Sequence, residues 1–240
     1  MLSESMQDYL KAIFKLQEHG GPVSTSALAE SLGVSAPSVT GMMKKLAGLR
    51  LLRHHPYQGV VLTKAGQRIA LEVIRHHRLL ELYLSQALGY SLDRVHDEAE
   101  KLEHAISEEF AEKIFEVLGR PTSDPHGHPI PARNGRLDRA DYALLSELEP
   151  GACGVIRQVS DGDAEILRYL GARGLLPEAA VEVLEKAPFD GPLTVRTGER
   201  SHILGRRLAS QIRVEAGDLP AAPRGARVRT GTRNSASSAI

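Results

Sequence analysis

Hydrophobic residues recur with a helical period in the first fifty positions of the chain. Between residues 3 and 19 they lie three or four positions apart, which predicts a helix that ends at Gly20 and Gly21. Ser24 or Ser26 caps a second, short helix through ALAESL. A third helix follows in APSVTGMMKKLAGLRL, where proline stands in the first turn and its missing N–H costs no hydrogen bond.

The pattern changes in LLRHHPYQGVVLT, residues 51–63. Two short apolar runs flank the turn Pro-Tyr-Gln-Gly, which predicts a β-hairpin. Helix, helix, turn, helix and a two-stranded wing, in this order, predict a winged helix-turn-helix.

The helical period returns between residues 63 and 119, with breaks at Gly89 and near Ser91, so two or three long helices are expected there. The stretch VHDEAEKLEHAISEEF, residues 95–110, fits a single helix with a polar face beside an apolar stripe. That stripe consists of Val95, Ala99, Leu102, Ile106 and Phe110.

A segment rich in proline and glycine, GRPTSDPHGHPIPARNG, ends the helical region and predicts a loop and a domain boundary. The runs GACGVIRQV, AVEVLEKA, LTVRTG and SQIRVEA then predict short strands, and AEILRYLGARGL predicts a helical insert. These elements are typical of a small β-barrel. The last segment has few large apolar residues and is expected to be disordered.

Composition narrows the class of protein. A length of 240 residues with 42% hydrophobic residues suits one large domain or a few small ones. No apolar run reaches the length of a membrane span, and the N-terminal segment lacks the pattern of a signal peptide, so a cytoplasmic protein without membrane contact is expected. Cys153 is the single cysteine, which excludes an intrachain disulfide.

The net charge of zero hides an uneven distribution. Residues 1–70 carry eight basic and four acidic residues, a net charge of +4, whereas residues 71–125 carry six basic and twelve acidic residues, a net charge of −6. The basic N-terminal segment indicates a polyanionic partner, and the acidic middle segment indicates a cation.

Histidine and glutamate side chains gather in that acidic segment. His96, Glu100, Glu103 and His104 share one face of the helix predicted over 95–110, and His77 and Glu81 lie one turn apart on the preceding helix. A solvated polar flank would explain one such helix. Two neighbouring helices that each pair histidine with glutamate instead favour a metal site with imidazole and carboxylate ligands.

The third predicted helix has the features of a DNA-recognition helix. Its N-terminal hydroxyl groups are suited to phosphate or base contacts, proline can touch thymine methyl groups, and nearby basic side chains can neutralise phosphates. Each hydroxyl group, taken alone, could equally be a helix cap. The candidate DNA contacts are Ser35, Pro37, Ser38, Thr40, Lys44 and Arg50.

Together, the winged helix, RHHRLLELYL, VHDEAEKLEH, PHGHPIP and the C-terminal barrel resemble the diphtheria toxin repressor and manganese transport regulator family, from about Ser5 to Glu215. The resemblance implies a mainly α protein with a small all-β domain. The implied parts are a winged helix-turn-helix DNA-binding domain at 1–71, a helical metal-binding and dimerisation domain at 72–130, a linker at 131–145, an SH3-like β-barrel similar to ferrous transport A at 146–216, and a disordered tail at 217–240.

The resemblance also implies the ligands. A primary metal site would join the N-terminal helix to the dimerisation helix through Asp8, Glu100, Glu103 and His104, with His77 as a bridging or second-ion ligand. A second ion is expected at Glu81, His96 and His126. Asp124 matches a loop position that supplies ancillary ligands in some manganese-type members, and in the barrel Asp163 or Glu165 could add a carboxylate.

Departures from the family pattern bear on the metal. Iron-responsive members carry cysteine and methionine where this chain has Glu100 and Asp8, and hard oxygen ligands suit Mn²⁺ better than soft sulfur does. Mn²⁺ is therefore the expected metal, Fe²⁺ is the alternative, and Co²⁺, Cd²⁺ or Zn²⁺ could substitute. Lys11 stands where manganese-type members carry an acid, which argues against two closely spaced ions.

The expected function is a Mn²⁺-activated homodimeric repressor that binds a palindromic operator and controls manganese or iron uptake. Mutual repulsion of Asp8, Glu100 and Glu103 would hold the winged domain loosely until metal binds, and the stripe from Val95 to Phe110 would form the dimer surface.

Besides activation of transcription instead of repression, two alternatives remain open at this point. One is a winged-helix regulator that responds to an organic effector. The other is a metalloenzyme, although the chain lacks H-E-x-x-H, and EKLEH spaces its outer pair four residues apart where di-iron bundles use Glu-x-x-His. The chain is therefore not expected to be an enzyme.

Overall fold

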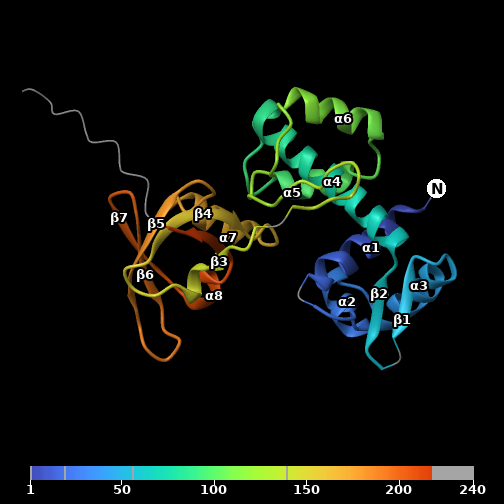
Figure 1. Ribbon diagram of the computed structural model, residues 1–240, viewed down its shortest axis with the longest axis horizontal. Coiled ribbons are helices and arrows are strands. Elements are labelled where there is room, and N and C mark those ends of the chain that lie inside the picture. Colours follow the sequence, from blue (N-terminus) through green and yellow to red (C-terminus); the bar gives the residue numbers. More distant parts are fainter. Residues whose placement is uncertain (1, 19, 56, 139, 218–240) are drawn as a thin grey trace, which may run out of the picture.

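The computed structural model describes residues 2–18, 20–55, 57–138 and 140–217 (Figure 1). Of the predicted disordered tail, residues 218–240 lie outside the described residues. Among the described residues, no helix is long and apolar enough to cross a membrane.

The N-terminal domain has the predicted winged helix-turn-helix order. It consists of α1 (Glu4–Gln17), α2 (Thr25–Leu32), α3 (Ala36–Gly48), β1 (Leu52–His55) and β2 (Gly59–Leu62), with the two strands paired antiparallel. The hydroxyl oxygens of Ser24 and Ser35 accept hydrogen bonds from the first turns of α2 and α3. Of the two caps that the sequence allowed for the second helix, Ser24 is therefore the one used.

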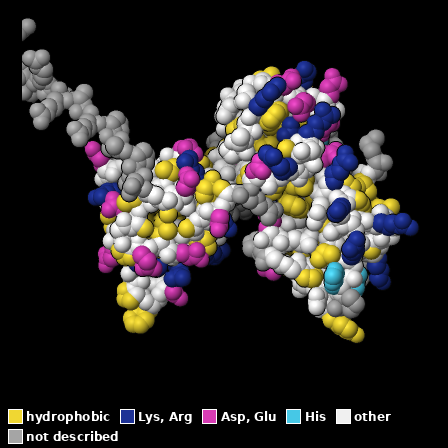
Figure 2. All heavy atoms as spheres, viewed as in Figure 1, with side chains coloured by type: hydrophobic (Ala, Val, Ile, Leu, Met, Phe, Trp, Pro, Cys, Tyr) yellow, Lys and Arg dark blue, Asp and Glu magenta, His cyan; other side chains and the backbone are white. Residues whose placement is uncertain are grey.

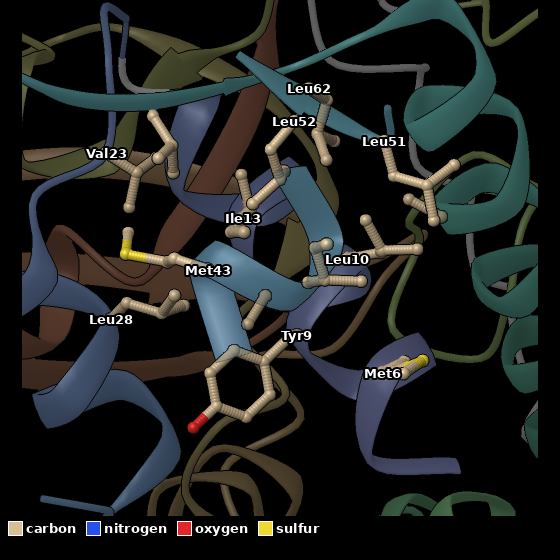
Figure 3. Packing of buried hydrophobic residues seen from close by; sticks show 14 of the residues in the cluster. Met6, Tyr9, Leu10, Ile13, Val23, Leu28, Met43, Leu51, Leu52 and Leu62 are labelled. Atoms are coloured by element: carbon tan, nitrogen blue, oxygen red, sulfur yellow. The ribbon is translucent and has the colours of Figure 1, made fainter. Parts of the chain in front are cut away.

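Helix α1 forms the centre of this domain. Leu10 and Ile13 are fully buried, and Figure 3 shows them among side chains of α2, α3 and the wing, including Leu28, Met43 and Leu52. Because α1 packs against the other two helices, the position of α3 depends on α1.

The middle of the chain is helical, as expected, but one predicted helix is two. Helix α4 (Lys64–Leu88) runs from the winged domain into a helical region completed by α5 (Val95–Leu102) and α6 (Glu108–Val117) (Figure 1). The prediction of a single helix over 95–110 is wrong. The hydroxyl oxygen of Ser107 accepts a hydrogen bond from the backbone N–H of Phe110, and this N-cap starts a new helix.

The break also removes the continuous apolar stripe. Val95 and Ala99 are fully buried within the chain's own core, whereas Phe110 is 49% exposed on the next helix. A stripe from Val95 to Phe110 therefore cannot act as one dimer surface.

The C-terminal part is the expected small all-β domain. Its six strands are β3 (Ala143–Leu144), β4 (Cys153–Val159), β5 (Ala180–Lys186), β6 (Leu193–Thr197), β7 (Arg200–Leu204) and β8 (Ile212–Ala216). They form one antiparallel sheet in the order β3-β8-β4-β5-β6-β7, with a short 3₁₀ helix at Leu145–Glu147 and helices α7 (Ala164–Gly171) and α8 (Arg206–Ala209). The sequence did not predict the two edge strands, β3 and β7.

The segment 119–135 is the predicted loop, and it fastens the β domain to α4. Arg75 and Arg78, both buried in α4, donate hydrogen bonds to the carbonyl oxygens of Pro131 and Pro129 at 2.9 and 2.5 Å. On its other side, the loop lies so close to β4 that a Cβ on Gly127, whose φ is +89°, would be 1.7 Å from the carbonyl oxygen of Arg157. Only glycine fits there.

Candidate metal centre

The first group of candidate ligands lies where α1 meets α5, and we call it the junction cluster: Asp8, Lys11, Glu100, Glu103 and His104. His104 Nε2 lies 2.7 Å from Asp8 Oδ1 and 3.4 Å from Glu103 Oε1. The other imidazole nitrogen, Nδ1, lies 2.7 Å from the amide oxygen of Gln7. With Nδ1 donating to Gln7, Nε2 is the nitrogen that faces the two carboxylates, and a cation bound there would replace the proton that Nε2 now donates to Asp8.

Lys11 occupies part of the junction cluster. Its ammonium nitrogen lies 2.6 Å from Glu100 Oε1 and 2.8 Å from both carboxylate oxygens of Glu103. Burial lowers the pKa of Lys11, but the charges of Glu103 and Glu100 outweigh it and raise the pKa above its usual range. The ammonium group therefore stays charged and already joins α1 to α5.

This arrangement changes two expectations. Lys11 lies between Glu100 and Glu103 and offsets much of their mutual repulsion without metal. Glu100 also lies apart from the group formed by Asp8, Glu103 and His104, whose ligand atoms all lie within 4.8 Å of one another; it is grouped instead with His77 and Glu103.

A second group, the loop cluster, lies where α4, α5, the loop and the β domain meet. It consists of Glu81, His96, Asp124, His126, His128 and Asp161. Glu81 is fully buried, and its Oε1 lies 3.0 Å from His77 Nε2 and 3.2 Å from His96 Nδ1. Burial raises the pKa of Glu81, but the charge of His77 and hydrogen bonds from the surrounding imidazoles hold it well below its usual range.

His77 connects the two clusters. Its Nδ1 lies 2.6 Å from Glu103 Oε2 of the junction cluster, while its Nε2 faces Glu81. Burial lowers the pKa of His77, but Glu81 and Glu103 outweigh it and raise the pKa. A change of charge in one cluster therefore acts directly on the other.

Several buried atoms of the loop cluster have no hydrogen-bond partner. They are Glu81 Oε2, Asp124 Oδ2, His126 Nδ1 and His128 Nδ1. Because a buried polar atom without a partner costs free energy, such groups are rare unless something else satisfies them. Four orphaned carboxylate and imidazole atoms in one place fit a divalent cation.

Hydrogen bonds within and around the loop determine which atoms of Asp124 and His126 face the cluster. Asp124 Oδ1 accepts hydrogen bonds from the backbone N–H groups of His126 and His128, at 2.8 and 2.9 Å, whereas Oδ2 has no hydrogen bond and lies 3.6 Å from Arg78 Nε. His126 Nε2 lies 3.2 Å from the carbonyl oxygen of Leu92, which can only accept, so Nε2 carries the proton. The other ring nitrogen, Nδ1, lies 3.7 Å from Glu81 Oε2.

The β domain contributes Asp161 and not Asp163. Asp161 Oδ2 lies 3.9 Å from His96 Nδ1 and 4.0 Å from His128 Nδ1. The carboxylate of Asp163 instead accepts hydrogen bonds from the backbone N–H groups of Glu165 and Ile166 as the N-cap of α7. Of the acidic residues in SDGDAE, Asp161 therefore lies beside the loop cluster, whereas the sequence favoured Asp163 or Glu165.

Sequence reasoning missed Asp161 and His128. The signals were present, since Asp161 stands in SDGDAE and His128 in PHGHPIP. Neither motif shows which of its acidic or imidazole groups turns inward. The remaining predicted ligands, Asp8, His77, Glu81, His96, Glu103, His104, Asp124 and His126, all lie in or between the two clusters.

A further group, Glu72, His76 and Glu108, is less suited to a cation. Arg68, Arg75 and Arg133 line the adjoining cavity of about 170 Å³, and Arg133 Nε lies 3.5 Å from Glu108 Oε1. Three guanidinium groups oppose a second positive charge.

The predicted DNA contacts lie on the surface of the winged domain. Ser35, Pro37, Ser38, Thr40, Lys44 and Arg50 are all exposed. Figure 2 shows Lys and Arg side chains over this domain, with histidine side chains near the wing. Ser35 also caps α3, and Thr40 donates to the carbonyl oxygen of Ala36, so two of the hydroxyl groups have structural partners.

Family models match three consecutive parts of the chain. Residues 1–60 match the iron dependent repressor N-terminal DNA binding domain, residues 63–132 match the iron dependent repressor metal binding and dimerisation domain, and residues 143–216 match the FeoA domain. Each range covers all or most of one of the three structural parts described above.

Whole proteins are similar over almost the full chain. The iron-dependent repressor IdeR of Mycobacterium tuberculosis is 31% identical over 226 residues, which cover 89% of this chain and 98% of that protein. A manganese-dependent transcriptional repressor solved with manganese is 39% identical with a TM-score of 0.82, covering 87% of this chain and 98% of the other. The manganese regulator SloR is 33% identical with a TM-score of 0.74, covering 88% and 98%.

Proposed function

The chain belongs to the family of metal-dependent DNA-binding repressors that includes the iron-dependent and diphtheria toxin repressors, and from this premise we propose that Mn²⁺ activates it to repress genes of metal uptake. The family is not enzymatic, and its dimerisation domain fits a homodimer. The observation that carries the proposal is the set of orphaned buried atoms in the loop cluster, contributed by α4 and the loop, with Asp161 of the adjoining β domain beside them.

Two groups of residues would hold metal. Glu81, Asp124, His126 and Asp161, with His96 beside them, suit one cation, and Asp8, Glu103 and His104 suit another. A bound divalent cation would supply the positive charge that these carboxylates lack. The carbonyl oxygen of Leu92 and the amide of Gln7 orient His126 and His104, so that in each histidine the other ring nitrogen faces the cluster and would bind metal once its proton leaves.

The donor set supports manganese as the first choice. Carboxylate oxygens predominate in the junction cluster, and Mn²⁺ prefers hard oxygen ligands. One solved relative contains manganese, whereas other relatives are named as iron-dependent. Fe²⁺ is therefore the second choice, and Co²⁺, Cd²⁺ and Zn²⁺ are possible substitutes.

Metal binding and DNA binding would be coupled through α1. Asp8 lies on α1, which packs against α2 and α3, and its partner His104 directly follows the end of α5. Binding between Asp8 and His104 favours the arrangement in which the winged domain is held against the helical domain. A ligand that binds one arrangement better shifts the population toward it.

In the proposed complex, α3 enters the major groove, and two copies related by a two-fold axis read a palindromic operator. The exposed side chains of Phe110 and Val117 on α6, 49% and 75% exposed, replace the predicted stripe as the proposed dimer surface. Lys44 and Arg50 would contact phosphates.

Lys44→Ala should weaken DNA binding without changing sequence preference. Each recognition helix would then neutralise one phosphate fewer, which should reduce the slope of log affinity against log salt by about one per phosphate. Fluorescence anisotropy at several salt concentrations measures this slope. Lys101→Ala, which removes an exposed lysine of α5, is the matched control and should leave the slope unchanged.

Mn²⁺ binding should weaken as the pH falls. Burial lowers the pKa of His126, but Glu81, Asp124 and Asp161 outweigh it and raise the pKa to about 9. An imidazolium cannot bind a metal, so the proton must leave first, and between about pH 8 and about pH 6 the affinity should fall by up to about tenfold per pH unit. Calorimetry in buffers of different ionisation enthalpy would detect the released proton; an affinity independent of pH would contradict this.

The proposed function is tested by DNA affinity with and without metal. A labelled palindromic promoter duplex should bind at least about tenfold more tightly in Mn²⁺ than in chelator, a coupling free energy of about 1.4 kcal/mol. The same measurement with Fe²⁺ under anaerobic conditions, with Co²⁺ and with Zn²⁺ ranks the metals by how much each tightens DNA binding. Equal affinity in Mn²⁺ and chelator would overturn the proposal and favour the alternative of an organic effector, for which the cavity of about 930 Å³ between loop and β domain offers space.

A further inference from the structure

We propose that His128 is an additional ligand of the loop cluster and that it shifts the metal preference of this cluster from Mn²⁺ toward Fe²⁺ and the later divalent metals. The proposal rests on the proposed function, since it assumes that the loop cluster binds metal. It adds an imidazole that neither the sequence motifs nor the similarity to known repressors assigned.

The position of His128 points its ring at the cluster. Its backbone N–H donates to Asp124 Oδ1, and its Nδ1 lies 3.3 Å from Asp124 Oδ2 and 4.0 Å from Asp161 Oδ2. The loop is held from both sides, by Arg78 through Pro129 and by β4 at Gly127, so this orientation is built into the fold.

The two facing atoms do not satisfy one another. His128 Nδ1 and Asp124 Oδ2 are both buried, and neither has a hydrogen bond despite their short separation. An ordinary histidine–aspartate pair would place a proton on the line between nitrogen and oxygen. The observed geometry instead suits a metal ion between the two atoms, to which the nitrogen and the oxygen would each direct a lone pair.

Other candidate ligands lie around His128. Ligand atoms of Asp124, His126 and His128 lie within 4.8 Å of one another, and Asp161 lies between His128 and His96. Three carboxylates, Glu81, Asp124 and Asp161, surround these imidazoles, and Arg78 lies at their edge with its Nε 3.6 Å from Asp124 Oδ2.

A further imidazole changes selectivity in a definite direction. Mn²⁺ gains little from replacing oxygen ligands by nitrogen, whereas Fe²⁺, Co²⁺ and Zn²⁺ gain progressively more. With His96, His126 and His128, the loop cluster offers three imidazoles beside three carboxylates. The junction cluster offers Asp8, Glu103 and His104, so the two clusters should differ in metal preference.

The test compares Mn²⁺ and Co²⁺ affinities, with Co²⁺ as the air-stable representative of the later metals. Chelator competition on the full chain should show that His128→Ala weakens Co²⁺ binding by at least about tenfold and Mn²⁺ binding by less than about threefold, a change within the range seen for residues around metal sites. His55→Ala, which removes an exposed histidine of the wing, is the matched control and should change neither affinity.

A spectroscopic readout makes the outcome independent of folding. Electron spin echo spectra of the Mn²⁺-loaded wild type should contain nitrogen couplings from all bound imidazoles, and His128→Ala and His128→Gln should each lose the contribution of one imidazole and keep the rest. Unchanged coupling together with an unchanged Co²⁺ to Mn²⁺ affinity ratio would show that His128 is only a structural partner of Asp124 and would overturn the inference. Failure of the wild type to bind either metal would instead overturn the proposed function.

Discussion

Lys11→Met should cost about 3 kcal/mol of unfolding free energy in chelator and much less in Mn²⁺. Lys11 is 5% exposed and Glu103 only 1% exposed, and removing one partner of a buried ion pair leaves an uncompensated charge that typically costs about 3 to 5 kcal/mol. A cation bound at Glu103 would restore the missing charge. Urea unfolding of wild type and variant, each with chelator and with excess Mn²⁺, measures both differences.

The matched control for this prediction is Lys101→Met. Lys101 forms an exposed pair with Glu98 one turn away, so its loss should change stability by less than about 0.5 kcal/mol in either condition. If Lys11→Met lost the same free energy with and without Mn²⁺, Lys11 would contribute packing alone. The electrostatic link between Lys11 and the metal would then be wrong.

Glu81→Gln should lower Mn²⁺ affinity by at least about 100-fold and remove the tightening of DNA binding by metal. Residues that only orient metal ligands already change affinity by about 10- to 100-fold, and Glu81 is itself a proposed ligand. Glutamine keeps the size of the side chain, so helical content should be retained. Calorimetry measures the metal affinity, and fluorescence anisotropy with the promoter duplex measures the DNA response.

Glu72→Gln provides the comparison for Glu81→Gln. Glu72 lies on the same helix, is exposed and faces the cavity lined by arginine side chains. The Glu72→Gln variant should retain the wild-type metal affinity and the wild-type tightening of DNA binding by metal. A normal metal response in Glu81→Gln would move the sensor away from the loop cluster.

The periodicity of the sequence predicted most of the fold because local physics determines those elements. Ser24, Ser35 and Thr63 cap helices through contacts three residues away, and the hairpin at 51–63 pairs neighbouring segments. The incorrect prediction of a single helix over 95–110 also has a local cause. A helical wheel assumes an unbroken helix, and the cap at Ser107 interrupts one whose apolar pattern continues on both sides.

The site was harder to predict because its contacts join distant positions. Asp8 and His104 are 96 residues apart in the chain yet 2.7 Å apart in space, and only the family resemblance brought them together. Lys11 was recognised as a departure from the family, but its pairing with Glu100 and Glu103 depends on the approach of α1 to α5. The choice between Asp161 and Asp163 depends on which carboxylate caps α7.

The most direct test of the central claim, that a divalent cation joins α4, the loop and the β domain, is anomalous scattering from crystals of the Mn²⁺-loaded protein. We expect an anomalous peak within coordination distance, about 2.0 to 2.4 Å, of Glu81 Oε2, His126 Nδ1 and Asp161. Manganese bound only elsewhere, or no ordered manganese at all, would contradict it.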